Sequence, residues 1–235
     1  MGEKRNKGAI VLFSGGLDST TVTYMARRQG YRSLILLSFD YGQNHSIELT
    51  LAKNIAGHLE CDHRIVRIDA SLFQNTALVG NKIPVPIENR TNDESSENAI
   101  PVTYVPARNI LFLSHALALA ESLEMEHIFI GANAVDYSGY PDCRPEFYRA
   151  FAEMARLGMK AGMEGNPVRI HTPLIHMTKA QIIQTGVELG VDYGLTSSCY
   201  QPGPEGQPCG KCDSCRYRAR GFKEAGIDDP LLSRF

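Results

Sequence analysis

The residues with the clearest chemical potential form the run Ser14-Gly15-Gly16-Leu17-Asp18-Ser19 near the N-terminus. The apolar stretch 9–13 precedes this run, and residues 19–28 have helical spacing, which predicts a turn between a strand and a helix. Two adjacent glycines let backbone N–H groups approach an anion, and the positive end of the following helix faces the same point. The serines add hydroxyl donors, and Asp18 could hold a magnesium ion. We interpret the run as a phosphate site, with an ordinary strand-to-helix connection as the alternative.

The glycine run does not have the spacing of a Walker A loop, because no Gly-Lys-Ser/Thr follows at the required distance. It resembles the SGGxDS pyrophosphate loop of the ATP pyrophosphatase family, whose members split ATP between the α and β phosphates. The resemblance implies an ATP-binding set made up of Phe13, Ser14, Gly15, Gly16, Leu17, Asp18, Ser19, Thr20 and Thr21.

Cysteine spacing gives a second chemical signal, C-x9-C-x2-C-x2-C, formed by Cys199, Cys209, Cys212 and Cys215. Two overlapping C-x2-C steps direct three thiolates at one ion, and a Pro-Gly-rich loop returns the fourth. This pattern predicts a closed tetrahedral zinc site that orders a segment too poor in apolar residues to fold by packing. An iron–sulfur cluster is the alternative, because C-x2-C-x2-C also occurs in ferredoxins. Disulfides are disfavoured in a chain expected to meet a reducing thiol pool.

Strand and helix patterns alternate along the chain. Strands are predicted over residues 9–13, 32–40, 63–69, 127–131 and 169–174, and helices over 19–28, 44–59, 107–121, 145–160 and 178–189. The alternation predicts an α/β fold with a doubly wound parallel sheet, which binds ligands at the carboxyl ends of its strands. Residues 80–105 are polar and contain proline, so we expect them to bury little and to form a long loop or lid.

Two loops that follow predicted strands carry many glycine, carboxylate and aromatic residues, namely 40–45 and 131–144. Such loops suit a pocket for a flat heterocycle, although solvated turns are the alternative. Arg108 and Lys179 each begin a predicted helix and could place a cation near phosphates. A solvent-exposed surface cation is the alternative for either residue.

Composition is that of a soluble enzyme. Lysine and arginine number 24 against 26 acidic residues, which gives a formal net charge of −2. A protein that grips a nucleic-acid backbone usually carries a basic excess or stripe, so no nucleic-acid partner is expected. No apolar run approaches the length that spans a bilayer, and the charged N-terminus leads into too few apolar residues for a signal peptide. We expect a cytoplasmic location and no membrane partner.

Nearly the whole chain resembles the 7-cyano-7-deazaguanine synthase (QueC) family of ATP pyrophosphatases. The resemblance is carried by FSGGLDSTT from Phe13, FDYGQNH from Phe39, VPARNILFL from Val105, DYSGYPDCRPEF from Asp136, TPLIHMTKAQI from Thr172 and the four-cysteine segment. Asn44 stands where the family often has a basic residue, and Ala107 where glycine is frequent. The implied fold is adenine nucleotide alpha hydrolase-like, with an ATP pyrophosphatase (PP-loop) domain over residues 1–195 and a small zinc-binding segment over 196–235.

The resemblance implies an ATP-dependent ligase of queuosine biosynthesis. It would convert 7-carboxy-7-deazaguanine and ammonia to 7-cyano-7-deazaguanine (preQ0) through an adenylated carboxylate, with ATP, Mg²⁺ and Zn²⁺ as cofactors. Asp18 would position magnesium, while Lys179 and Arg108 would stabilise charge on the transferring phosphates. The candidate substrate-binding residues are Asp136, Asp142 and Arg144. A homodimer is expected.

Three other functions are compatible with parts of this pattern. A thiolation-type tRNA-modifying enzyme would share the phosphate loop, but the basic balance is weak and no appended RNA-binding segment is seen. A relative could use the same amide-forming chemistry to attach a deazapurine to a protein. A catalytically silent zinc-binding interaction module would leave the phosphate loop without a purpose.

Overall fold

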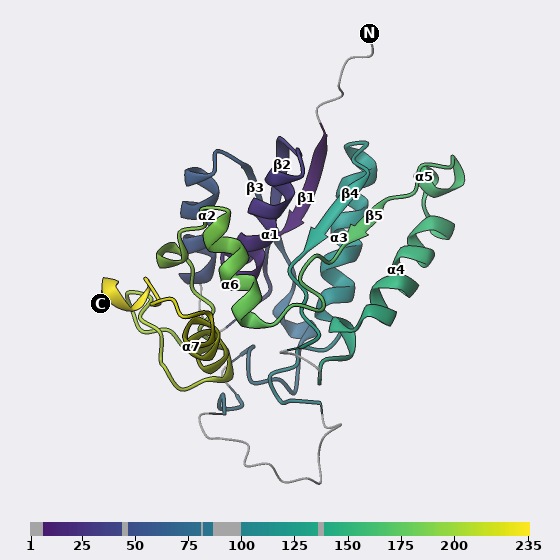
Figure 1. Ribbon diagram of the computed structural model, residues 1–235. Coiled ribbons are helices and arrows are strands. Elements are labelled where there is room, and N and C mark those ends of the chain that lie inside the picture. The colour runs from purple at the N-terminus through teal and green to yellow at the C-terminus, as the bar shows by residue number, and fades with distance from the viewer. Residues whose placement is uncertain (1–6, 44–46, 81, 87–99, 136–138) are drawn as a thin grey trace.

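The computed structural model describes residues 7–43, 47–80, 82–86, 100–135 and 139–235. Its centre is a five-stranded parallel sheet in the order β3-β2-β1-β4-β5 (Figure 1). The strands are β1 (Gly8–Leu12), β2 (Ser33–Asp40), β3 (Asp62–Arg67), β4 (His127–Ile130) and β5 (Arg169–His171). The α-helices are α1 (Leu17–Arg28), α2 (Ile47–His58), α3 (Arg108–Ser122), α4 (Pro145–Gly158), α5 (Lys160–Met163), α6 (Lys179–Glu188) and α7 (Asp213–Ala225). Short 3₁₀ helices are η1 (Ala70–Leu72), η2 (Pro141–Cys143), η3 (Tyr193–Leu195) and η4 (Leu232–Arg234).

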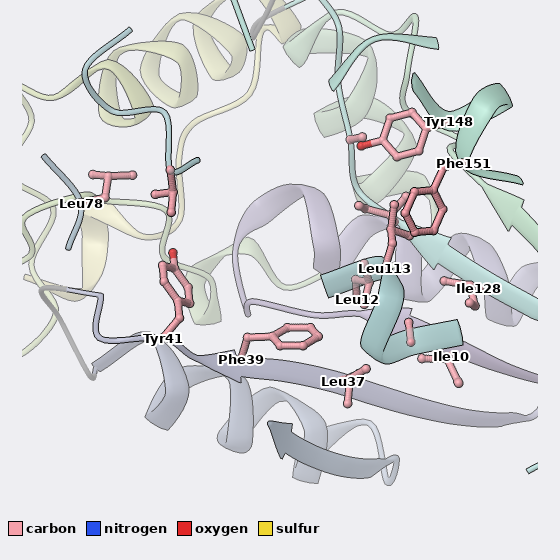
Figure 2. Packing of buried hydrophobic residues seen from close by; sticks show 14 of the residues in the cluster. Ile10, Leu12, Leu37, Phe39, Tyr41, Leu78, Leu113, Ile128, Tyr148 and Phe151 are labelled. Carbon is pink, nitrogen blue, oxygen red and sulfur yellow. The ribbon is translucent and has the colours of Figure 1, made fainter. Parts of the chain in front are cut away.

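Helices cover both faces of the sheet. Successive side chains of β1 accordingly point into two different apolar clusters, one on each face. Ile10 and Leu12 belong to the cluster that α3 and α4 complete. Figure 2 shows these two residues close to Leu113 of α3. Ala9 and Val11 face the other way, into the cluster formed with α1, α2 and α6. A central strand without a polar face is the pattern of a doubly wound sheet, so the predicted α/β fold class is confirmed.

The strand order fixes where a ligand would bind. β1 lies between β2 and β4, with Leu12 in register with Leu37 on one side and with Ile130 on the other. The chain leaves β1 into α1 on one face of the sheet, whereas β4 leads to α4 on the opposite face. The connections therefore diverge at the carboxyl ends of β1 and β4, which is the switch point where such sheets bind ligands.

Helix α7 was not predicted from the sequence. It packs against α6, and a Cβ on Gly221 would lie 2.4 Å from Cγ of Lys179, so the two helices approach closely at this glycine. Phe222 is 2% exposed and joins the cluster beneath α6. Part of residues 196–235 therefore packs against α6 through α7, and the expectation that a metal orders the cysteine segment stays a prediction. The division of the chain at residue 195 stays a prediction.

The polar stretch 80–105 is also more buried at its ends than expected. Val85, Thr103 and Val105 are 3%, 2% and 1% exposed, and both valines join the cluster beside α3. Its central part, residues 87–99, lies outside the described residues. The predicted lid therefore stays a prediction. Within the described part of the chain, no helix is long and apolar enough to cross a membrane.

A buried ion pair ties α7 to the end of the chain. Arg218 and Asp229 have side chains 6% and 7% exposed, and their N–O distances are 2.7 and 2.8 Å. The same guanidinium donates to the carbonyl oxygens of Tyr193 and Thr196, at 2.9 and 3.3 Å. Arg218 therefore holds η3, α7 and the C-terminal segment together.

We expect Asp229→Asn to lower the free energy of unfolding by about 3 kcal/mol, because it leaves the buried Arg218 charge uncompensated. The matched control is Glu224→Gln, which removes an exposed pair with Arg220 and should cost less than about 0.5 kcal/mol. Urea unfolding of both variants measures the difference. Equal losses would show that the buried pair does not act as described.

Candidate active site and metal centre

The glycine run after β1 forms the predicted turn at the start of α1. Gly15 has a φ of +75°, and a Cβ there would lie 2.9 Å from backbone atoms of Ala52, so both conformation and space require glycine. The turn folds around its own hydroxyls: the Ser14 N–H donates to Oγ of Ser19 at 3.2 Å, and the Gly16 N–H to Oγ of Ser14 at 3.3 Å. Because α1 begins at Leu17, the turn lies at the positive, N-terminal end of this helix.

A cavity of about 260 Å³ opens at the carboxyl ends of β1, β2 and β4. Its lining comes from the glycine turn, the strand ends, the first turns of α2 and α3, and the segment between η3 and α7. Gly131, after β4, lies against the turn, since a Cβ there would be 3.1 Å from the backbone nitrogen of Ser19. The cavity therefore occupies the switch point that the strand order defines.

Six of the nine predicted ATP-binding residues line the cavity, namely Phe13, Ser14, Gly16, Leu17, Asp18 and Ser19. Gly15 forms the turn but is not part of the lining. Thr20 and Thr21 are buried behind the turn, and the Thr21 hydroxyl bonds to the Leu17 carbonyl oxygen at 2.8 Å and to the Tyr193 hydroxyl at 2.7 Å. Thr21 therefore supports α1, and a contact of Thr20 or Thr21 with ATP stays a prediction.

Asp18 and Lys179 form a pair at the edge of the cavity. Nζ of Lys179 donates to both carboxylate oxygens of Asp18, at 2.8 and 2.9 Å, and the side chains are 6% and 21% exposed for lysine and aspartate. Lys179 begins α6 directly after Thr178, which forms a capping box with Gln181. The structure thus brings together two residues that the sequence predicted to act on phosphates.

Arg108 lines the cavity at the first position of α3. Burial opposes its charge, but the neighbouring Tyr41 and Asp142 outweigh burial and raise the pKa of Arg108 above its usual value, so the side chain is a cation. The Tyr41 hydroxyl is also its hydrogen-bond partner. Ala107 precedes it with a φ of +56°, a conformation that favours glycine and explains why glycine is frequent there in the family that the sequence resembles.

The predicted substrate-binding residues are placed differently. Asp142 is 4% exposed and caps α3, because its Oδ2 accepts the N–H of Asn109 at 3.1 Å. Arg144 is exposed and donates from Nε to the carbonyl oxygen of Pro141 at 3.3 Å. Neither residue is part of the cavity lining that the described residues form, and Asp136 lies outside those residues. A direct contact of these residues with substrate stays a prediction.

An aromatic wall faces the cavity and was only partly anticipated. Tyr41 belongs to the predicted loop 40–45, but Phe39 of β2 and Phe112 of α3 were missed. Phe112 stacks on Phe39 with ring centroids 3.9 Å apart and planes at 5°, and Tyr41 meets Phe112 edge-on at 5.4 Å. Phe112 lies one turn after Arg108 on the same helix face, which is the spacing that could have revealed it.

Two titratable groups in the cavity have raised pKa values. Glu48, in the first turn of α2, lines the cavity, and burial raises its pKa to about 7 although Arg108 acts to lower it. Burial also raises the pKa of Cys143 to about 12, which keeps this thiol protonated. The sequence analysis missed Glu48. Its closeness in the chain to the predicted loop 40–45 was the one signal that could have pointed to it.

The four predicted cysteine ligands converge. The Sγ atoms of Cys199, Cys209, Cys212 and Cys215 all lie within 4.8 Å of one another. Four sulfurs at about 2.3 Å from one tetrahedral ion would be about 3.8 Å apart, so a single ion fits after a small contraction. A cubane cluster would separate the sulfurs farther, because iron and sulfide atoms lie between them. The four cysteines therefore form a candidate metal site whose spacing suits a single ion.

Backbone amides surround these sulfurs. Sγ of Cys199 accepts the N–H groups of Gln201 and Cys209 at 3.4 and 3.2 Å, and Sγ of Cys209 accepts those of Lys211 and Cys212, both at 3.4 Å. Donors of this kind stabilise thiolates, the form in which cysteine binds metal.

A parallel sheet whose central strand β1 leads into a glycine and serine turn, beside the pair of Asp18 and the buried Lys179, is the arrangement of an ATP-using α/β enzyme. The chain belongs to the family described as "Queuosine biosynthesis protein QueC", which matches residues 8–226.

Curated relatives support this assignment over almost the full length. The 7-cyano-7-deazaguanine synthase of Magnetococcus marinus is 57% identical over 223 residues, which cover 94% of this chain and 95% of the relative. The proteins of the same name from Pseudomonas aeruginosa (strain LESB58) and Syntrophus aciditrophicus are 56% and 53% identical, with coverage of 95% and 97% of this chain and 97% of each relative. Among solved structures, the NMN synthetase from Francisella tularensis is similar with a TM-score of 0.49 and 16% identity, covering 98% of this chain and 82% of its own.

We expect Glu48→Gln to stabilise the protein above pH 7 and to change little at about pH 4. The folded state holds the Glu48 proton up to a pKa of about 7, whereas the ordinary value is 4.5, so ionisation costs stability as the pH rises through this window. The neutral amide avoids a cost on the order of 1–3 kcal/mol. Urea unfolding at about pH 4 and about pH 8 measures the gain. A difference that is independent of pH would contradict the assignment.

Proposed function

We propose that this chain is an ATP-dependent ligase that converts 7-carboxy-7-deazaguanine and ammonia to 7-cyano-7-deazaguanine in queuosine biosynthesis. The observation that carries the proposal is the cavity itself, which joins the glycine turn and the Asp18–Lys179 pair to a flat aromatic wall. Relatives that are 53–57% identical and carry the name 7-cyano-7-deazaguanine synthase support the choice of substrate.

The reaction needs activation because a carboxylate oxygen is a very poor leaving group. In the proposed course, a carboxylate oxygen of the substrate bonds to the α-phosphorus of ATP, and pyrophosphate leaves. Ammonia attacks the acyl carbon and loses a proton, and AMP leaves to give the amide. A second ATP activates the amide oxygen in the same way, and loss of AMP and of the nitrogen-bound protons gives the nitrile.

The residues of the cavity would share this work. Backbone N–H groups of the glycine turn and the positive end of α1 would receive the departing pyrophosphate. Arg108, which stays charged in the cavity, would balance charge on the phosphates. Lys179 would hold the Asp18 carboxylate in place. The aromatic wall with Phe112 offers the apolar flat surface that a purine-like ring requires.

Two metal ions belong to the proposal. Magnesium in phosphate sites is usually bound through one or two carboxylates together with phosphate oxygens, so Asp18 fits that role. It would neutralise charge on the phosphates. Zinc is the proposed ion of the four-cysteine centre, because four thiolates and no open position describe a structural zinc site.

A cytoplasmic location and a homodimer are part of the proposal as well. Reduced cysteines in a metal centre suit a compartment with a reducing thiol pool. Met154 and Leu157 of α4 and Met163 of α5 are 48%, 60% and 79% exposed, which supports the burial of this face against a second copy.

The reaction can be tested directly. Purified protein is incubated with ATP, Mg²⁺, ammonium and 7-carboxy-7-deazaguanine, and nucleotide and base products are analysed together. We expect AMP, pyrophosphate and the nitrile. Release of ADP would overturn the proposed phosphate chemistry, and transfer of a deazapurine to protein without nitrile would replace the proposed product.

We expect Asp18→Asn to lower kcat for nitrile formation by roughly a hundredfold or more, since it weakens the carboxylate contact with both Lys179 and magnesium. The exposed Asp228→Asn serves as the control and should keep wild-type kcat. Steady-state rates at saturating ATP and Mg²⁺ measure the effect. A normal rate in Asp18→Asn would show that Asp18 has another role.

A further inference from the structure

Ser197 is a buried hydroxyl group for which the structure provides no partner. The residue is 4% exposed, yet its Oγ has no hydrogen-bond partner among the described residues. Ser197 is also part of the cavity lining. A buried hydroxyl that is left unpaired is unfavourable, so a group that enters the cavity and bonds to it would be stabilised.

The segment Ser197–Ser198 lies directly against the glycine turn. A Cβ on Gly16 would be 3.2 Å from Oγ of Ser198 and 3.4 Å from the carbonyl oxygen of Ser197. The Leu17 N–H donates to Oγ of Ser198 at 3.3 Å. The second serine is thus bonded to the turn itself, while the hydroxyl of the first is buried beside it without a partner.

Both ends of this segment are fixed. Thr196 is fully buried, and its hydroxyl accepts from Arg218 at 2.8 Å and donates to the Tyr193 carbonyl oxygen at 2.8 Å. On the other side, Cys199 is 3% exposed and belongs to the four-cysteine centre. The two serines therefore span a short distance between a buried hydrogen-bond network and a metal site, which restricts their backbone.

We propose that Ser197 is a further ligand of the nucleotide phosphates, and that the four-cysteine centre positions it against the glycine turn through Cys199. The proposal rests on the proposed function, because the ligand would be the diphosphate portion of ATP or the pyrophosphate released from it. The neighbouring turn lies at the positive end of α1, so the species that would bind there is an anion. The Ser197 hydroxyl donates to one of its oxygens.

The test is binding of magnesium pyrophosphate and of ATP to the metal-loaded full-length protein, measured by isothermal titration calorimetry. We expect Ser197→Ala to raise both Kd values about tenfold, with a Tm equal to or above that of wild type because a buried unpaired hydroxyl is removed. The matched control is Ser114→Ala, whose exposed hydroxyl donates to the Ile110 carbonyl oxygen within α3, and its Kd values should not change. A Kd in Ser197→Ala within twofold of wild type would overturn the proposal.

Hydrogen exchange provides a second readout on the same proteins. Magnesium pyrophosphate should protect amides of residues 14–19 and of 197–201 in the wild type, and only those of 14–19 in Ser197→Ala. Equal protection of 197–201 in both proteins would also contradict the role of Ser197. If the wild type neither binds pyrophosphate nor forms AMP, the proposed function fails, whereas tight binding by both proteins refutes only the role of Ser197.

Discussion

The ion pair between Asp18 and Lys179 is the interaction on which the arrangement of the site depends. It joins the first turn of α1 to the first residue of α6, across 161 positions of sequence, and lysine is almost fully buried. A buried charge is stable only with its partner, so the starts of both helices must stay together. Gly221 of α7 packs on the Lys179 side chain. The Asp18–Lys179 pair therefore also influences how closely α7 approaches the glycine turn.

The cavity is consequently built from both ends of the chain. The N-terminal strand supplies the turn, and the segment before α7 supplies a wall that a metal centre and the buried Arg218 network hold in place. The opposite wall belongs to α3, whose first turn is capped by Asp142 from beyond β4. A carboxylate at that position orients the helix start and holds negative charge beside Arg108 without facing the cavity.

Local patterns in the sequence predicted the parts of the site that are continuous in the chain. The glycine run and the cysteine spacing are of this kind, since a turn or a metal loop is set by neighbours within a few residues. Glu48 could not be found in this way, because its place in the cavity depends on how α2 docks on the sheet, whereas the spacing of Phe112 from Arg108 was a local signal that was not used. Helix α7 was missed because its many charged residues hide the few apolar positions that it buries, such as Phe222.

The left-handed backbone at Ala107 limits how this sequence can change. Glycine would adopt the same φ without strain but would lose more chain entropy on folding, so the two smallest residues are nearly balanced there. A β-branched residue would meet a steric penalty without that compensation. Residue 107 is therefore a position where natural drift and laboratory libraries should converge on alanine or glycine, for reasons of backbone conformation alone.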